Sequence, residues 1–385
     1  MFQNRHTRFS HQVSWIVLAL CCGMASVLPL HTQADTVPDT GLADALAYVE
    51  KQPLAASVLA ALPQNRVVFV GEIHDRYDHH LNQLAVLQAL HQKNPNIAIG
   101  VEWFQQPFQG AVNDFLAGKI DETAFLRQSE YYERWGYDFR QLRPILAYAK
   151  ANRLPVVALN APVELTRKVS KGGLEALTAT ERAQLPAVIH PPSAAYRQQL
   201  KKIFAVHSDD KQQFENFLLV QRIWEETMAQ QAVRYLEKHP QHQMVVLAGV
   251  GHISNDAGIP ADVARHMPQA KLLTLASSDI PALPSGTVDQ VLASTSLTLP
   301  PSGKLGVLLD TQDNGLHITA LDKNSAASKA GLQQGDRLAR VDNQELHTMA
   351  DLKLALAQRQ VGDAVQVAVE RGGAKAPLAY TVVLQ

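Results

Sequence analysis

The chain has 385 residues, more than one ordinary domain holds, so two domains are the natural expectation. Hydrophobic residues make up 46% and charged residues 18%, which provides for packed cores and excludes a wholly disordered chain. The formal net charge of −1 gives no basic surface for nucleic acid, so we expect no nucleic-acid partner.

The N-terminus has the three parts of a secretory signal. Arg5 and Arg8 precede an apolar, acid-free run at 13–30, and small residues lead up to Ala34. This order predicts a signal peptide over 1–34 with cleavage after Ala34. The alternative is a membrane anchor, because the run is nearly long enough to span a bilayer, but the small-residue site favours cleavage.

The two cysteines of the sequence, Cys21 and Cys22, both lie inside this signal. Leu20 fits poorly as the residue before a lipidated cysteine, so an outer-membrane lipoprotein is the minority alternative. After cleavage the mature chain has no cysteine, which excludes disulfides, thiolate ligands and covalently attached c-type haem. We therefore expect an exported protein of the periplasm or cell envelope.

Five short apolar runs, rich in β-branched residues, predict the strands of the first domain. They do not alternate with polar residues, as expected for parallel strands covered on both faces. The runs are 67–70, 97–101, 156–159, 244–248 and 272–275. Helical patterns lie between them, the longest over 214–232. The alternation predicts an α/β fold: an open, mostly parallel sheet flanked by helices, with right-handed crossovers.

Two connections are longer than a sheet crossover needs. Residues 103–153 contain an aromatic-rich stretch between 131 and 139, and residues 161–240 are mostly helical. Helical insertions of this size after strand ends usually build a lid or a pocket wall.

A change of composition marks the end of the first domain. From 280 to 303 the chain is rich in Pro, Ser, Thr and Gly, which is typical of a linker. We expect the α/β domain over 35–285, a linker over 286–302, and a small, mostly β domain over 303–385 with one helix near 349–358.

Polar side chains gather where the predicted strands end. The carboxyl ends of parallel strands meet at one sheet edge, and open α/β sheets bind ligands there. The residues at these ends are Glu72, His74, Glu102, Asn160 and His252, with His79 and His80 just beyond the first strand. Residues far apart in the sequence are thus predicted to converge on one pocket.

Three kinds of chemistry fit this set of residues. Imidazoles and carboxylates bind a divalent metal and activate water, which predicts a hydrolase using Glu72, His74, Glu102 and His252, with His74 and His252 on the metal. The same groups act as general acid and base without a metal. They also surround haem when a tyrosine or histidine binds the iron. Taken one at a time, each residue is explained equally well as a helix cap or a partner for buried backbone.

Several motifs, in order along the chain, resemble the ChaN-type haem-binding, iron-regulated proteins. They are Gly71-Glu72-Ile73-His74-Asp75, Asp78-His79-His80, Glu102-Trp103-Phe104, Leu159-Asn160-Ala161-Pro162, Glu226-Thr227-Met228-Ala229 and Gly249-Val250-Gly251-His252-Ile253. The resemblance covers about residues 50–280. The family belongs to a wider group that includes Tiki-type metalloproteases and erythromycin esterases.

The resemblance implies haem as the cofactor of a homodimer in bacterial iron acquisition, with a tyrosine on the iron and a histidine near a propionate. Tyr131 or Tyr132 is the candidate for that tyrosine. The other candidate haem contacts are His74, His79, His80, Glu102, Asn160 and His252. A metal-dependent hydrolase that uses His74, Glu102 and His252 is the alternative, so an enzymatic activity stays open.

The last segment, about residues 303–385, resembles the PDZ domains of bacterial HtrA-type proteases. Leu305-Gly306-Val307 matches the carboxylate-binding loop, and Ala330-Gly331-Leu332 with Gly335-Asp336 matches a turn of that family. A PDZ groove binds an extended peptide by strand addition and holds its terminal carboxylate on backbone N–H groups. We therefore expect a peptide or protein partner at Leu305, Gly306 and Val307. A domain that only packs against its neighbour is the alternative.

Overall fold

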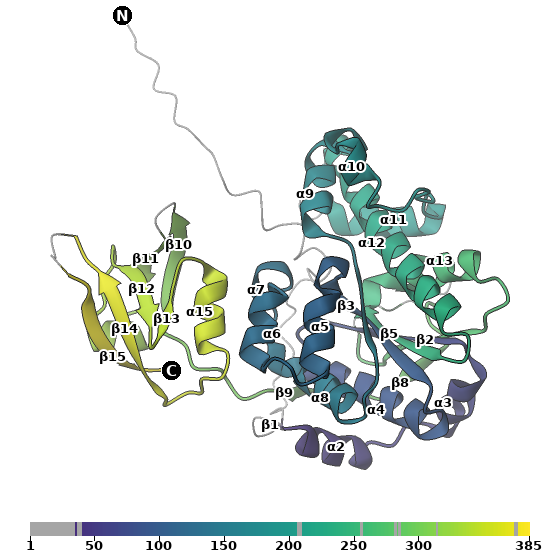
Figure 1. The fold of residues 1–385 in the computed structure, drawn as a ribbon, viewed down its shortest axis with the longest axis horizontal. Helices are drawn as coiled ribbons and strands as arrows, with labels where there is room; N and C mark the ends of the chain where they lie inside the picture. Colours follow the sequence, from purple (N-terminus) through teal and green to yellow (C-terminus); the bar gives the residue numbers. More distant parts are fainter. Residues whose placement is uncertain are drawn as a thin grey trace, which may run out of the picture.

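The computed structural model shows an α/β domain followed by a small β domain (Figure 1). It describes residues 35–36, 41–205, 210–254, 257–280, 283, 286–312, 315–372 and 376–385. The predicted signal peptide, 1–34, lies outside these residues. Among the helices of the described ranges, none combines the length and the apolar character that a bilayer crossing needs.

A six-stranded parallel sheet forms the centre of the α/β domain, with the strand order β4-β3-β5-β2-β7-β8. The strands are β2 (Val67–Glu72), β3 (Ile97–Gln105), β4 (Val156–Asn160), β5 (Gln243–Gly249), β7 (Leu272–Ser277) and β8 (Gln290–Leu292). Every residue of β2, β3 and β5 is buried, because helices cover both faces. The predicted open parallel sheet and its five strands are confirmed.

The sixth strand corrects the expected linker. β8 lies inside 286–302, pairs with β7 through Leu275 and Gln290, and buries Leu292. Three residues are too few to give a strand pattern of their own, and the edge of β7 supplies the partner that makes them a strand. Next to it, β9 (Leu297–Thr298) pairs with β1 (Asp35–Thr36). The sheet of the α/β domain therefore continues to Leu292.

Alternate residues of β2 belong to different cores on the two faces of the sheet. Val68 and Val70 pack with the helices α2 (Leu42–Lys51), α4 (Tyr77–Lys93) and α8 (Arg143–Ala151). Val67 and Phe69 pack with α9 (Val163–Gly172), α12 (Lys211–Lys238) and α13 (Gly258–His266). The short helices α3 (Ala56–Ala61) and η1 (Leu62–Gln64) precede the sheet. The predicted long helix over 214–232 is part of α12.

The two long connections carry helical insertions at the sheet edge where the strands end. The insertion after β3 contains η2 (Gln106–Phe108), α5 (Gln109–Leu116), α6 (Glu122–Gln128), α7 (Tyr131–Arg134) and η3 (Phe139–Gln141). The connection after β4 contains, besides α9 and α12, η4 (Leu174–Ala176), α10 (Ala179–Arg182) and α11 (Ala194–Phe204). After β5 the chain forms η5 (Val250–His252) and β6 (Ile253–Ser254). The insertion after β3 borders two cavities, one at the strand ends and one beside the C-terminal domain.

The C-terminal domain is a separate antiparallel sheet with the order β10-β11-β12-β14-β15 and with β13 paired to β12. Its elements are β10 (Val307–Gln312), β11 (Gly315–Leu321), α14 (Ala326–Ala330), β12 (Arg337–Val341), β13 (Gln344–Glu345), α15 (Met349–Leu356), β14 (Ala364–Glu370) and β15 (Leu378–Val383). Leu316, Leu338 and Val367 are among the residues of its own buried core. The predicted small, mostly β domain, with a helix near 349–358, is confirmed.

Burial of β2 predicts where the α/β domain is most sensitive. Phe69 is fully buried, and we expect Phe69→Ala to lower the free energy of unfolding by about 3–5 kcal/mol, because it leaves a cavity. Urea denaturation followed by circular dichroism measures the loss. Val291 on β8 is 54% exposed, and Val291→Ala, the control, should stay within about 0.5 kcal/mol. Equal losses for both variants would contradict this core.

Candidate functional site

The carboxyl ends of four strands meet at the floor of a cleft. His74, Glu102, Asn160 and His252 line one small cavity of about 30 Å³. Glu72, the last residue of β2, contacts His74 from the side. The structure thus brings together the five strand-end residues that the sequence placed at one edge.

His74 and Glu72 form a buried pair. His74 Nδ1 lies 2.5 Å from Glu72 Oε1, and this contact fixes the orientation of the imidazole ring. Burial by itself raises the pKa of Glu72, but His74, with smaller contributions from His80 and His79, holds the pKa of this carboxyl below its ordinary value. The other oxygen, Glu72 Oε2, is buried without a hydrogen-bond partner among the described residues.

Gly249, the last residue of β5, holds the neighbouring groups in place. A Cβ atom there would lie 2.6 Å from Cε1 of His74, so a larger residue displaces the imidazole. The backbone N–H of Gly249 also donates to Glu102 Oε2 at 2.7 Å. On the other side, Asn160 Nδ2 donates to the backbone oxygen of Glu102 at 3.1 Å. The backbones of β3, β4 and β5 therefore position His74 and Glu102 together.

His252 is held between two carboxylates. Its Nδ1 lies 3.2 Å from Glu225 Oε1, and its Nε2 lies 3.6 Å from Glu102 Oε1. Because a carboxylate only accepts hydrogen bonds, Glu225 favours the tautomer that carries a proton on Nδ1. The ring therefore presents Nε2 on the side of Glu102 and the cavity.

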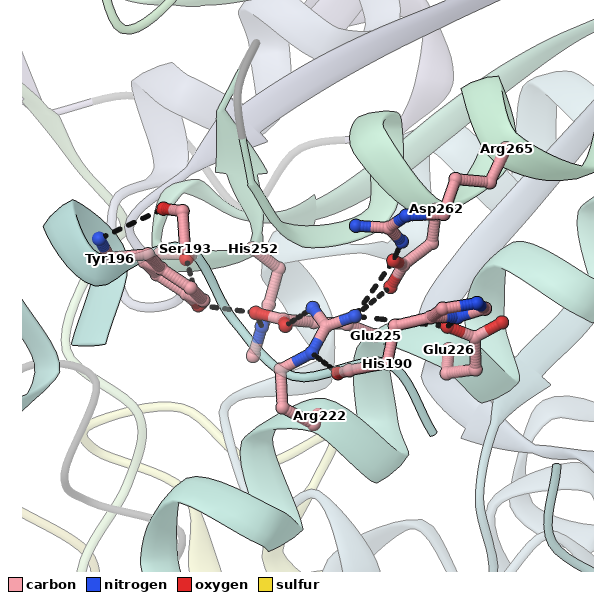
Figure 2. A network of polar contacts seen from close by, with 10 residues as sticks. His190, Ser193, Tyr196, Arg222, Glu225, Glu226, His252, Asp262 and Arg265 are labelled. Atoms are coloured by element: carbon pink, nitrogen blue, oxygen red, sulfur yellow. Dashed lines mark hydrogen bonds and ion pairs between the residues drawn. The ribbon is translucent and has the colours of Figure 1, made fainter. Parts of the chain in front are cut away.

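A buried network of polar contacts supports Glu225 from behind (Figure 2). Glu225 accepts hydrogen bonds from the hydroxyl of Tyr196 and from Arg222. Arg222 also binds both oxygens of Asp262, at 2.7 and 2.8 Å. Burial, together with the neighbouring carboxylates Glu226 and Glu225, raises the pKa of Asp262 although Arg222 opposes the rise. The network fixes the carboxylate that orients His252, and its charges are compensated inside the protein.

Glu226, the next residue of α12, lies 3.7 Å from Arg222 and also has two histidine partners of its own. It contacts Nε2 of His266 at 2.6 Å and Nδ1 of His190 at 3.2 Å. Burial by itself raises the pKa of Glu226, but these two hydrogen bonds outweigh it and leave the pKa below its ordinary value. The sequence singled out Glu226 through a motif and missed Glu225. Successive residues of a helix point about 100° apart, so only the fold shows which one meets His252.

The insertion after β3 supplies the wall opposite His74. The ring centroids of Trp135 and Tyr137 lie 4.6 and 5.1 Å from that of His74, and Arg134 lines the same cavity. Gln105, Trp103, Val163 and Trp224 complete the lining. The sequence indicated a lid from the aromatic stretch, but nothing in the stretch marked which aromatic residues face the cleft.

The two tyrosines singled out from the sequence do not line this cavity. Tyr131 is 1% exposed and packs against Phe104 and Phe139 in the core. Tyr132 lines a different cavity, between the two domains. Burial raises the pKa of both phenols, which disfavours the tyrosinate form that binds iron. Of the tyrosines in the described residues, Tyr137 is the one that lines the cleft.

His79 and His80 support the turn after β2 and do not line the cavity either. His79 Nδ1 accepts the backbone N–H of Ile73 at 3.1 Å, and its Nε2 lies 3.0 Å from Asp279. Burial lowers the pKa of His79. His80 Nε2 lies 3.2 Å from the backbone oxygen of His74. Both imidazoles act on the pocket indirectly, by holding the loop that carries His74.

The side chains of the cavity suit either a metal ion or haem, but its volume has room only for the metal ion. Glu72, His74 and Glu102 each offer a ligand atom, and these atoms lie within 4.8 Å of one another, which suits a metal ion. Aromatic rings, a phenol and an imidazole suit haem. About 30 Å³ holds a water molecule or an ion, whereas ligand pockets for larger molecules need about 300 Å³ or more. The side chains of the cleft therefore suit haem, but the space would hold haem only if the Trp135–Tyr137 wall moved outward.

Comparisons with known proteins match both domains of the chain to family models. A family model described as "Haem-binding uptake, Tiki superfamily, ChaN" matches residues 58–263, and a PDZ domain model matches residues 303–382. A solved structure, "Cofacial heme binding to ChaN of Campylobacter jejuni", is similar over 62% of this chain and 90% of that chain, with a TM-score of 0.50 and 17% identity. At this identity the likeness shows the fold. The resemblance inferred from the motifs is confirmed.

Two other similarities are more limited. The "Serine protease Do-like HtrA" of Lactobacillus helveticus is 37% identical over 60 residues, which span 16% of this chain and 14% of that protease. Because the match covers so small a part of the protease, it does not indicate protease activity in this chain. A mutant of the erythromycin esterase EreC, in its open conformation, is similar over 60% of this chain and 76% of that chain, with 13% identity and a TM-score of 0.36, too low to argue from.

The close contact at Gly249 predicts the effect of one added methyl group. We expect Gly249→Ala to displace His74 and to lower the free energy of unfolding by about 1–3 kcal/mol, because the site is already packed. Urea denaturation measures the stability, and the His74 ring resonance in NMR spectra reports the displacement. A Cβ at Gly251 meets nothing within 4 Å, so Gly251→Ala is the matched control. An unchanged His74 resonance in Gly249→Ala contradicts the close packing of these two residues.

The lowered pKa of Glu226 predicts a dependence of stability on pH. Its ionised form stabilises the fold above the unfolded-state pKa of about 4.3, and this contribution is lost as the pH falls through the lower folded-state pKa. Glu226→Gln should therefore cost more stability at pH 6 than at pH 3. Exposed Glu237 on the same helix provides the control, Glu237→Gln. Thermal unfolding across this pH range measures the stability of both variants. A loss of stability in Glu226→Gln that does not depend on pH would contradict a lowered pKa of Glu226.

Proposed function

We propose that this chain, which belongs to the haem-binding ChaN family of the Tiki superfamily, binds haem in the cleft between the strand ends and Arg134–Tyr137. The observation that carries the proposal is Tyr137, a phenol whose ring centroid lies 5.1 Å from that of His74. Around these two groups the cleft is lined by three tryptophans, Trp103, Trp135 and Trp224. Phenols and imidazoles are iron ligands, and aromatic rings pack well on a porphyrin.

The residues of the cleft have separate roles in this proposal. Bound haem supplies the iron, and Tyr137 is the ligand that we assign to it in place of Tyr131 or Tyr132. His74, oriented by Glu72, faces the same space. Arg134 lines the cavity and has the charge to bind a propionate, although it now donates to Glu130 and Glu164. Haem therefore competes with two carboxylates for this guanidinium.

The biological setting is part of the proposal. We infer that the chain is exported, because of the signal pattern over 1–34, and that it serves haem or iron acquisition in the bacterial cell envelope. The similar ChaN structure from C. jejuni is one of cofacial haem binding. We expect haem to bring two copies of this chain together, with their clefts facing each other.

A metal-dependent hydrolase is the second candidate. Its motivation is the group Glu72, His74 and Glu102, whose ligand atoms lie within 4.8 Å of one another, together with the unpartnered Glu72 Oε2. A divalent ion would satisfy that oxygen. The family match favours haem, and metal analysis of protein purified without chelator separates the two candidates.

The C-terminal domain is proposed to bind peptides at Leu305, Gly306 and Val307. Gly306 has a φ of +72°, and a Cβ atom there would lie 2.7 Å from Cβ of Ser325. Glycine alone fits this close left-handed turn without strain. Successive backbone N–H groups in such a turn form a site for a carboxylate.

Hemin titration of the mature protein tests the haem proposal. We expect a saturable Soret shift with the spectrum of high-spin, tyrosinate-ligated iron. Tyr137→Phe should weaken hemin binding at least tenfold and abolish that spectrum, because it removes the oxygen ligand. Tyr132→Phe, a neighbouring phenol that does not line the cleft, is the matched control. Absence of a saturable shift, with stoichiometric metal in the purified protein, would support the second candidate instead.

A further inference from the structure

A second cavity, of about 430 Å³, lies between the two domains. One of its walls belongs to the C-terminal domain and is formed by residues 302–307, β10 and α15. The other wall belongs to the insertion after β3 and includes Tyr132, Gly136 and Tyr137. Figure 1 shows the same closeness, with α15 beside α6 and α7. The proposed carboxylate-binding loop therefore opens toward the α/β domain.

The shape of this cavity suits an extended peptide. β10 ends the strand order of its sheet, and the cavity lies between Leu309 on β10 and Leu352 on α15. An edge strand accepts an added strand through its backbone groups. Leu305, Val307 and Leu356 also line the cavity and provide an apolar surface for a terminal side chain.

The charges of the cavity select an anion. Among its lining residues Lys304, Lys353 and Arg140 are cationic, and Asp138 is the carboxylate. Asp138 is already bound by Arg140 at 2.6 Å. The two lysines are left to balance a further negative charge, so the chemistry of the cavity fits a peptide with a free C-terminal carboxylate and an apolar last residue.

Lys353 links this cavity to the haem cleft. Its Nζ donates to the backbone oxygen of Gly136 at 2.9 Å and lies 6.0 Å from the ring centroid of Tyr132. Gly136 stands between Trp135 and Tyr137, the two aromatic residues that close the cleft over His74. Tyr137 lines both cavities. Lys353 therefore connects the C-terminal domain to the wall of the cleft.

We propose that a C-terminal peptide binds in this composite groove, draws Lys353 away from Gly136 through its carboxylate, and so releases the wall that closes the haem cleft. A carboxylate competes with the Gly136 carbonyl for the Lys353 ammonium, because the carboxylate carries a full negative charge and the carbonyl only a dipole. Peptide and haem then bind with positive linkage, and each raises the affinity of the protein for the other by the same factor.

The probe is the tightest binder from random heptapeptides displayed with free C-termini, synthesised as the free acid and as the C-terminal amide. Hydrogen exchange of the full mature chain, without hemin, is measured first. The acid peptide should speed the exchange of amides at 133–138 at least fivefold, and the amide peptide should not. Hemin titration follows, in which saturating acid peptide should lower the dissociation constant about fivefold or more.

Lys353→Met reproduces the release without peptide. It should bind hemin more tightly than the wild type, and peptide should add no further gain. Lys329→Met, which removes a lysine from the same domain outside the groove, is the matched control and should keep the peptide effect. Peptide binding without faster exchange at 133–138 overturns the inference, as does a screen in which no peptide binds the full chain.

The hemin arm rests on the proposed function, whereas the exchange arm does not. If the acid peptide speeds hydrogen exchange at 133–138 but the protein binds no hemin, peptide binding in the composite groove is supported and haem binding is rejected. If hemin binds with the same affinity with and without peptide, haem binding is supported and the linkage between the two sites is rejected.

Discussion

Parallel pairing of β2, β3, β4 and β5 is the constraint on which the rest of the structure depends. Because the strands run in one direction, their carboxyl ends carry side chains from four distant parts of the sequence to one edge. Close packing then restricts the positions of the side chains at that edge. Gly249 leaves just enough space for His74, and its N–H fixes Glu102. The floor of the cleft is therefore rigid before any ligand arrives.

The two sides of the cleft differ in how they are held. Behind the floor, Glu225 and Arg222 lie in a buried network whose charges compensate one another, and breaking such a network leaves an unpaired charge at high cost. The opposite wall, Trp135 to Tyr137, is tied to the C-terminal domain by the bond from Lys353 to Gly136. The floor is thus held within the α/β domain, whereas the wall also has a contact to the C-terminal domain.

The strands and the strand-end residues could be predicted from the sequence because their signals are local. A buried parallel strand is a short apolar run, and the residue after it marks the sheet edge. β8 could not be predicted, since its three residues become a strand only beside β7. Tyr137 and Glu225 were missed for a related reason. Whether Tyr131 or Tyr137 faces the cleft depends on how the insertion docks, which no short pattern encodes. The loop from Leu305 to Val307 has a sequence signal, but nothing in the sequence shows that it faces the insertion after β3.

The most direct measurement is a crystal structure of the mature protein soaked with hemin. We expect iron bound by the phenol oxygen of Tyr137, a porphyrin in the cleft beside His74, and Trp135 displaced from its present contact with that imidazole. Iron bound through Tyr131 or Tyr132, haem located away from the strand ends, or a metal ion held by Glu72, His74 and Glu102 with the wall still closed would contradict it.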